Sequence, residues 1–237
     1  MHEASGQDFS RKFCGLGQPP APARLGTRFD ETGAFLPEPG NTVVSHVVPG
    51  SDTERAMVRV RDRLRALDPG GHFAWTPVSS YHMTIFQGVI EGRRLPGYWP
   101  AELPLDTPIA ETTDHLAARL QGFPPIEPFR VRLDEITPHG LTVSGATPAD
   151  EAIIRGFRDE LAGRFGYRHP DHDTYVLHLT LSYTVRWLPR GSHELYLPAL
   201  RELTRSFQAE VPVIELGPAD FCAFADMNHF EPVLRLT

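Results

Sequence analysis

The sequence predicts an α+β fold with two similar lobes, and three observations support this prediction. An amphipathic helix, a short connection and a β-strand follow one another in this order twice along the chain. Both strands contain a His-x-Thr motif, one beginning at His82 and the other at His178. Hydrophobic residues make up 41% and charged residues 22% of the 237 residues, which is ordinary for a globular protein with a sizeable core.

Composition and the repeated pattern together divide the chain. Residues 1–26 are rich in Gly, Pro and Ala, and we interpret them as an irregular arm. Residues 27–237 have the size of one domain and are predicted to form a single bilobal catalytic unit. Its first lobe element spans residues 41–89, its second spans 129–187, and an insertion at 90–128 separates them.

In the first lobe, a strand, a helix and a motif strand are predicted in turn. The apolar run 42–48 ends a hairpin-like region that is rich in Pro and Gly. Ser51 opens the helix, because Glu54 follows at the spacing of a capping box and apolar residues continue at helical spacing to Leu67. The motif strand then covers residues 81–86.

The second lobe repeats this order. Strands are predicted at 129–133 and 141–143, on either side of a Pro-His-Gly turn. Thr147 is predicted to cap a helix that starts with a proline and that Gly166 ends. The second motif strand covers residues 175–181.

Elements are also predicted outside this repeat. Helices are expected from about 107 to 120 and from 192 to about 209. The tail is expected to complete the sheets with strands at 213–216 and 221–224. Trp99, in the insertion, is interpreted as a buried anchor for a long loop, with a lid over the cleft as the alternative.

The alternation of side chains in a strand explains why the His-x-Thr spacing matters. Side chains two residues apart lie on the same face, so His82 shares a face with Thr84, and His178 shares a face with Thr180. If the two lobes meet with these faces inward, two imidazoles and two hydroxyls line one site. Phe86 is predicted on the His82 face, where it stacks on a base or ribose, with plain core packing as the alternative.

The double occurrence of the motif makes it informative. About one His-x-Thr is expected by chance in a chain of this composition. Two motifs with an apolar residue after each His and each Thr have a chance probability on the order of 0.01. We therefore predict that the two histidines, together with Thr84 and Thr180, are catalytic rather than ordinary strand residues.

Two histidines suit the cleavage of a phosphodiester. The reaction requires a base for the attacking oxygen and an acid for the leaving oxygen, and imidazoles that titrate near neutrality supply both. Threonine hydroxyls donate hydrogen bonds to the non-bridging phosphate oxygens. This chemistry needs neither a metal nor an organic cofactor, and we predict none.

The tetrapeptides His-Met-Thr-Ile at 82–85 and His-Leu-Thr-Leu at 178–181 resemble the motifs of the 2H phosphoesterase superfamily. That superfamily includes 2′-5′ RNA ligase-like proteins and cyclic phosphodiesterases. The resemblance implies a bilobal α+β fold with two pseudo-symmetric, mainly antiparallel sheets, flanking helices and a central cleft. It also implies action on 2′,3′-cyclic or 2′-5′-linked phosphoesters. The segment Tyr-Trp-Pro at 98–100 looks like a branch known only as a domain of unknown function.

The residues after the motifs depart from the pattern of some members, which carry Arg or Lys there to hold phosphate. Gln87 and Tyr183 stand at those places in this chain. Arg186 is the nearest cation after the second motif; a surface charge is the favoured interpretation for it, and phosphate binding is the other. We predict Phe86, Tyr183 and Arg186 as the substrate-binding residues.

Charge and cysteine content limit the partners and the compartment. The formal net charge is −7 and no Lys/Arg block is present, which favours a small phosphoester, a nucleotide or an RNA terminus over a long duplex. The two isolated cysteines favour a reducing cytoplasm. No secretory signal and no membrane span is predicted.

Two rival hypotheses stand beside the phosphodiesterase. In the first, the segment His-Pro-Asp-His-Asp at 169–173 joins His82 and His178 in a metal-dependent hydrolase. A solvated loop is favoured for this segment, because fixed ligand spacing is missing next to a proline. In the second, the cleft captures a nucleotide or an RNA end without turnover.

Overall fold

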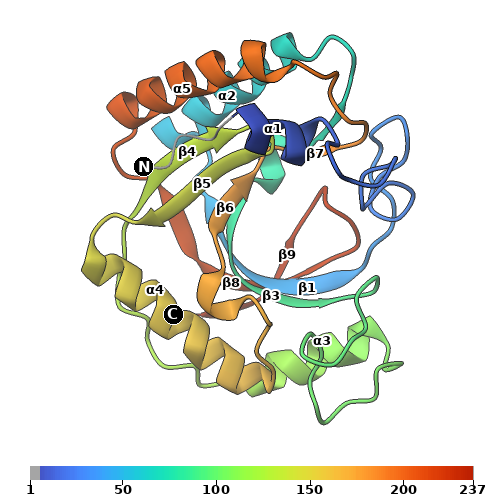
Figure 1. Cartoon of the computed structure of the whole chain (residues 1–237). Helices are drawn as coiled ribbons and strands as arrows, with labels where there is room; N and C mark the ends of the chain where they lie inside the picture. Colours follow the sequence, from blue (N-terminus) through green and yellow to red (C-terminus); the bar gives the residue numbers. More distant parts are fainter. Residues whose placement is uncertain (1–5, 237) are drawn as a thin grey trace.

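The computed structural model describes residues 6–236 and has a large, curved antiparallel sheet at its centre (Figure 1). Its strands occur in the order β4 (Val131–Thr137), β5 (Gly140–Gly145), β6 (Leu177–Thr180), β3 (His82–Ile90), β1 (Gly40–Val47), β8 (Leu216–Phe224) and β9 (Glu231–Leu236). A second, small sheet pairs β2 (Phe73–Trp75) with β7 (Ser182–Thr184). Over the described residues, the helices are α1 (Gly6–Phe13), α2 (Asp52–Leu67), α3 (Ile109–Arg119), α4 (Pro148–Phe165) and α5 (His193–Glu210).

The predicted α+β class is confirmed, and the structure adds how the two motif halves are joined. Strands β4, β5 and β6 form one half of the large sheet, and β3, β1, β8 and β9 form the other. The halves meet where β6 pairs with β3, so that the two motif strands are direct neighbours in one continuous sheet.

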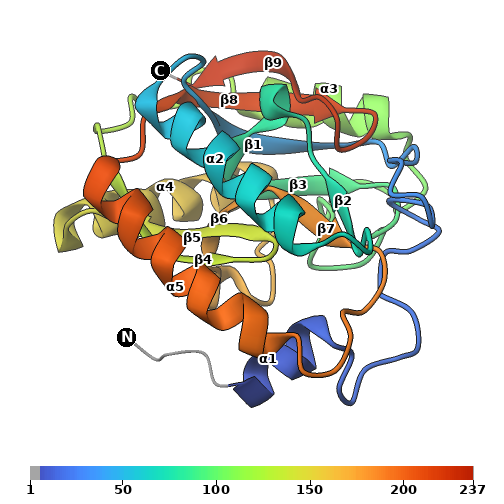
Figure 2. The same cartoon turned by 90° about the horizontal axis from the view of Figure 1, so that it is seen from above.

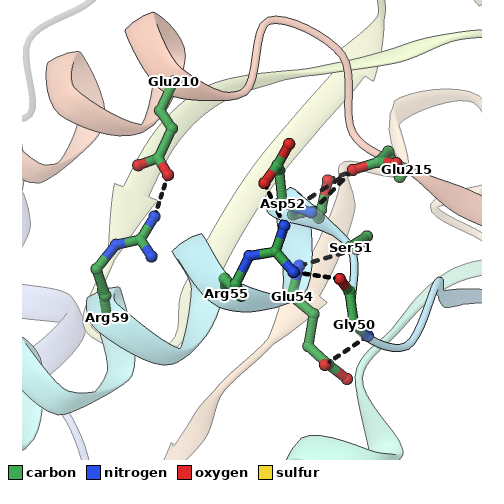
Figure 3. Close-up of polar contacts among 9 residues, drawn as sticks. Gly50, Ser51, Asp52, Glu54, Arg55, Arg59, Glu210 and Glu215 are labelled. Atoms are coloured by element: carbon green, nitrogen blue, oxygen red, sulfur yellow. Dashed lines mark hydrogen bonds and ion pairs between the residues drawn. The ribbon is translucent and has the colours of Figure 1, made fainter.

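Helix α2 begins and ends where the sequence predicts. The Ser51 hydroxyl accepts a hydrogen bond from the Glu54 amide at 3.1 Å, and the Glu54 carboxylate accepts one from the Gly50 amide at 2.8 Å (Figure 3). The Glu215 carboxylate accepts a further bond from the Asp52 amide at 3.1 Å. The bonds from the Asp52 and Glu54 amides satisfy groups of the first turn that have no partner inside the helix, and the bond from Gly50 fixes the residue before the cap.

Helix α4 also has its predicted ends. The Thr147 hydroxyl accepts a hydrogen bond from the Asp150 amide at 3.1 Å, and Pro148 occupies the first turn. Gly166 ends the helix with a φ angle of 74°, a left-handed conformation that glycine adopts without strain. The repeated order of strand, helix and strand in the two lobes is therefore present in space.

Helices α2 and α5 lie side by side in both views of the molecule (Figures 1 and 2). An ion pair between Arg59 of α2 and Glu210 of α5 joins their exposed sides (Figure 3). The predicted helices at 107–120 and 192–209 correspond to α3 and α5 within a few residues. No described helix has both the length and the apolar character needed to cross a bilayer.

The prediction of an irregular N-terminal arm is wrong for part of its length, because α1 lies within it. Phe9 and Phe13 of α1 are buried in the main core beside α5. This burial stabilises a helix that is too short to be stable on its own. Residues 1–5 of the arm lie outside the described residues.

Several strands differ from the predicted ones. The tail forms one continuous strand, β8, in place of the two segments at 213–216 and 221–224. Strand β9 follows it and was not predicted, and neither were the short strands β2 and β7. In the hairpin-like region before β1, pairing is limited to isolated bridges such as Phe29 with Phe35.

The large sheet has two different faces. On one face, the alternate motif-strand residues Met83 and Leu179 are completely buried in the main core, together with side chains of α2, α4 and α5. On the other face, Val44 and Cys222 belong to a smaller cluster that includes Phe230 from the β8–β9 connection. The candidate site lies on this second face.

Candidate active site

The two motifs lie opposite each other on neighbouring strands of the sheet. Strands β3 and β6 are antiparallel, and Met83 lies opposite Leu179. Counting one residue outward in each direction places His82 opposite Thr180, and Thr84 opposite His178. Each histidine of one motif therefore faces the threonine of the other motif.

All four side chains lie on one face of the sheet. The intervening residues Met83 and Leu179 have 0% exposure, whereas His82, Thr84, His178 and Thr180 are half-buried. The two histidines are diagonal neighbours across the strand pair, and such positions are separated by roughly 7–8 Å. That spacing leaves room for one phosphate between the two rings.

Both imidazoles are oriented by the same local bond. Nδ1 of His82 lies 2.7 Å from the carbonyl oxygen of Ser80, and Nδ1 of His178 lies 2.9 Å from that of Val176. A carbonyl oxygen only accepts, so Nδ1 carries a proton in each ring. Nε2 is then the nitrogen left to exchange a proton with a substrate in both cases.

The surroundings of His82 include two aromatic rings. The ring of Phe230 lies 4.2 Å from its ring, and that of His46 lies 6.1 Å away. Burial lowers the pKa of His82 to about 4, and the nearby His46 and His178 add to this effect, while the bond to Ser80 opposes it. His82 is consequently neutral at pH 7.

A pocket of about 950 Å³ opens beside His178 and Thr180. Its walls come from α1, α5, the β4–β5 hairpin and β6, and they combine apolar side chains such as Leu197 with Lys12 and the hydroxyl of Thr142. His139 also lines it, and burial lowers its pKa to about 4, with the charges of His178 and Lys12 acting in the same direction. His178 thus faces a roomy pocket, whereas His82 faces aromatic rings.

Phe86 is not at the site, which corrects the prediction that it contacts substrate. Val43 pairs with Phe86 and Val44 pairs with Thr84, so Ile85 is an extra residue in β3. This bulge turns both Ile85 and Phe86 to the core face, because it breaks the alternation. Phe86 is completely buried, with its ring 5.2 Å from that of Phe165.

The same bulge brings Gln87 to the face that carries His82 and Thr84. Gln87 lies opposite Thr42 of β1 and is half-buried. Its amide oxygen accepts a hydrogen bond from Nη1 of Arg93 at 3.0 Å. Sequence reasoning assigned no role to Gln87, because a bulge inside an apolar strand has no sequence signal of its own.

Tyr183 lies on the site side, and Arg186 does not. The Tyr183 ring packs at 5.9 Å against Phe29, and the guanidinium of Arg28 lies 5.3 Å above it. Arg186 instead donates hydrogen bonds of 3.0 Å to the carbonyl oxygens of Gly70 and Gly71. Arg186 is exposed, as the interpretation of a surface charge requires, and these bonds hold the loop after α2.

The segment 169–173 is only in part the solvated loop that we expected, because Pro170, Asp171 and Asp173 are exposed and the two histidines are buried. His169 and His172 are 4% and 3% exposed, and His169 stacks on Phe86 with ring centroids 5.3 Å apart. Nε2 of His172 lies 3.0 Å from a carboxylate oxygen of Asp159. Across residues 6–236, no three His, Cys, Asp or Glu side chains are grouped so that they could hold a metal ion.

Trp99 is buried, as the favoured interpretation required. It is 2% exposed, and its Nε1 donates a hydrogen bond of 3.0 Å to the carbonyl oxygen of Pro104. This bond closes the loop within the insertion. The guanidinium of Arg94 also packs over the Trp99 ring at 4.7 Å. Trp99 therefore anchors the insertion from inside.

Two further polar residues on the site face were missed. His46 pairs with His82 across β1 and β3, and Asp220 pairs with Val44 across β1 and β8. Asp220 is buried and forms an ion pair of 3.0 Å with Arg235. Alternation along 42–48 could have indicated His46, but the position of Asp220 depends on the pairing of distant strands.

The fold and this site define a class of protein. The matching family model is described as 2H-phosphodiest, a domain of unknown function (DUF1868), and it covers residues 28–142. The chain belongs to this family, within the 2H phosphoesterase superfamily. The matched range includes the motif at His82 and ends before the motif at His178.

A solved structure is similar over nearly the whole length. It is the crystal structure of a conserved protein of unknown function, ATU0111, from Agrobacterium tumefaciens. The two sequences are 45% identical, the match covers 98% of this chain and 99% of that one, and the TM-score is 0.94. No curated protein matches the sequence.

Proposed function

We propose that the protein is a phosphodiesterase that cleaves a small cyclic or 2′-5′-linked phosphoester by acid–base catalysis with two histidines and without a metal. Suitable substrates are a nucleoside 2′,3′-cyclic phosphate and an RNA end that carries a cyclic phosphate. The observation that carries the proposal is the antiparallel pairing of the two motif strands, in which each histidine lies opposite the threonine of the other motif. Both imidazoles therefore lie on one face of the sheet, and each uses Nδ1 for a backbone bond, which leaves Nε2 for the substrate. The family name supports the reaction class.

The two histidines have different roles in this mechanism. His82 acts as the base, because its lowered pKa keeps it neutral and its Nε2 lone pair available at pH 7. His178 acts as the acid from the edge of the pocket. The charge of His178 lowers the pKa of His82, so protonation of both rings at once is unfavourable. A pair of rings that carries one proton suits a mechanism with one base and one acid.

The proton transfers balance in each turnover. Water attacks the phosphorus of the cyclic ester while Nε2 of His82 takes its proton. The bond from phosphorus to one ribose oxygen breaks, and that oxygen takes the proton from Nε2 of His178. Thr84 and Thr180 donate hydrogen bonds to the non-bridging oxygens and hold the phosphorus between the rings. Proton exchange with solvent then restores both imidazoles.

The pocket beside His178 receives the organic part of the substrate. Its volume of about 950 Å³ is of the size that ligand sites have. Apolar side chains such as Val176 and Leu200 suit a base or a sugar face, and Lys12 at the wall suits further phosphate charge. The leaving oxygen then lies on the same side as the proposed acid.

A substrate screen tests the proposal. Purified protein is incubated with 2′,3′-cyclic nucleotides, 2′-5′-linked dinucleotides and cyclic ADP-ribose phosphates, with and without EDTA. We expect turnover of at least one class, unaffected by EDTA and strongly reduced in His82→Ala and His178→Ala. His115→Ala is the matched control, because His115 lies on exposed α3 beside Glu102.

Other outcomes support the rival hypotheses. Turnover that EDTA removes and a divalent metal restores would favour a metal-dependent hydrolase. Tight binding of a nucleotide without product, with the same affinity in His82→Ala, would favour a binding module.

A further inference from the structure

A group of polar side chains, four of them buried and Arg93 half-buried, adjoins the candidate active site. We call it the arginine cluster, and its members are Arg93, Arg158, Tyr167, His169 and Tyr175. Gln87 connects it to the site face, because it follows Thr84 on β3 and accepts the hydrogen bond from Arg93. Tyr175 forms the second connection, with its ring 5.8 Å from that of His178.

The cluster has more hydrogen-bonding groups than partners. Buried atoms without a hydrogen-bond partner are Nε and Nη2 of Arg93, Nε of Arg158, the hydroxyl of Tyr167 and Nε2 of His169. Arg158 also donates to the carbonyl oxygen of Ile85 and, at 3.3 Å, to that of His172. Four of the unpartnered atoms are donors or hydroxyls, which matches the needs of an anion with several oxygens.

The charge of the cluster is positive. Arg93 stacks on Tyr98 at 4.3 Å and Arg158 stacks on Tyr175 at 4.2 Å, and within residues 6–236 neither guanidinium forms an ion pair with a carboxylate. The exposed Asp171 influences the pKa of both arginines without a bond to either. A buried charge without a paired counter-charge is strongly unfavourable, which favours a ligand that supplies one.

The other titratable members remain neutral. Burial and the charges of Arg93 and Arg158 lower the pKa of His169 to about 3. Burial raises the pKa of Tyr175 to about 12, against the opposing effect of Arg158. The cluster therefore keeps two positive charges and two phenolic donors throughout the physiological pH range.

We propose that the arginine cluster binds a second anionic group of the substrate, of the phosphate class, while the scissile phosphate lies between the histidines. This inference rests on the proposed function for the identity of the substrate. A strand rises about 3.3 Å per residue, so Gln87 and Thr84 are separated by roughly 10 Å at most, a distance that a nucleoside cyclic phosphate with a phosphate chain on its 5′ oxygen can span. The substrate class is then a cyclic or 2′-5′ phosphoester that carries an additional phosphate, such as a nucleoside 2′,3′-cyclic phosphate with a 5′-phosphate or 5′-diphosphate.

The first test measures substrate preference. The value of kcat/KM is compared for a nucleoside 2′,3′-cyclic phosphate with and without a 5′-phosphate. We expect wild-type protein to prefer the phosphorylated substrate by at least about tenfold, the value of one charge-assisted hydrogen bond. Arg93→Met should reduce this preference to about onefold, and Arg93→Lys should retain part of it. Arg63→Met, on the exposed side of α2, should keep the full preference.

The second test does not depend on turnover. Thermal unfolding of the full chain is followed with and without pyrophosphate, which should raise the melting temperature of wild type and of Arg63→Met but not that of Arg93→Met. If wild type cleaves no substrate and this difference persists, the proposed function fails and the anion site stands. An equal shift in wild type and Arg93→Met, or an unchanged substrate preference, would overturn the anion site. Instability of Arg93→Met that pyrophosphate does not relieve, with no shift in wild type, would assign Arg93 a structural role.

Discussion

The His82 and His178 motifs have the same backbone geometry and very different surroundings. Each histidine bonds through Nδ1 to the carbonyl two residues before it, and each faces the threonine of the other strand. His82 is covered by Phe230, whereas His178 opens on the large pocket. The comparison shows that the repeated strands fix the direction of each ring, while the segments around the two rings differ. In the proposed mechanism, this difference is what makes His82 the base and His178 the acid.

The largest expected effect comes from the two histidines themselves. His82→Ala and His178→Ala should each lower kcat/KM by at least about 100-fold, because each removes one proton transfer. The double variant should lose little more than the weaker single variant, since a base without its acid is of limited use. Steady-state kinetics on the substrate found by screening measures this, and near wild-type turnover in either single variant would contradict the mechanism.

The threonines test whether the two halves share the phosphate equally. Thr84→Val and Thr180→Val keep the β-branched shape that suits a strand and remove only the hydroxyl. Each should lower kcat/KM by about tenfold, the value of one hydrogen bond to a charged group. If only one variant shows a loss, the phosphate is bound to one strand, and the pseudo-symmetric arrangement would need revision.

The third prediction concerns the pH dependence that the aromatic cover gives to His82. A base must be unprotonated, so kcat/KM of wild type should decline only as the pH falls through about 4, the pKa of His82. Phe230→Ala admits water to the ring and should raise this pKa by on the order of one unit toward its ordinary value, which moves the decline to higher pH.

Phe224→Ala is the control for that shift. It removes a ring from the same cluster, 5.1 Å from Phe230, and leaves the Phe230 ring beside His82 in place. If kcat/KM declines at the same acidic pH in Phe230→Ala and in wild type, the base that titrates is a group other than His82.

The smallest expected effects compare the caps of the two lobe helices. Ser51→Ala removes one bond to the Glu54 amide and should lower the free energy of unfolding by about 1 kcal/mol. Thr147→Ala should lower the free energy of unfolding by about 2 kcal/mol, because the Thr147 hydroxyl also donates a hydrogen bond to the Asp150 carboxylate. That carboxylate in turn accepts a hydrogen bond from the Arg130 amide at 2.8 Å. Urea unfolding measures both, and a larger cost for Ser51→Ala would show that the caps are not comparable in this way.

The sequence was most informative where local chemistry decides the structure. The capped helices α2 and α4 were predicted with their ends, because Ser51, Thr147 and Gly166 act within one helical turn. The shared face of His82 with Thr84, and of His178 with Thr180, follows from alternation alone. The catalytic roles of these four residues remain predictions that the experiments above address.

The failures arose where distant contacts decide the structure. Helix α1 is only eight residues long and depends on the burial of Phe9 and Phe13 beside α5. The bulge at Ile85 moves Phe86 into the core and Gln87 to the site. It depends on the register between β1 and β3, which changes by one residue between Val43 and Val44. Strands β2 and β7 have three residues each, too few for any periodicity to be visible.

The single pairing of Met83 with Leu179 has a consequence for how the chain can change in length. A shift of the register by one residue in either strand would turn its histidine and threonine to the opposite face of the sheet. A single insertion or deletion within β3 or β6 would therefore separate the two halves of the site. Changes of length should therefore be tolerated in the connections between the strands, such as the segment 90–128, and not within β3 or β6. Natural variants of this protein should differ in the size of their loops and agree, residue for residue, along these two strands.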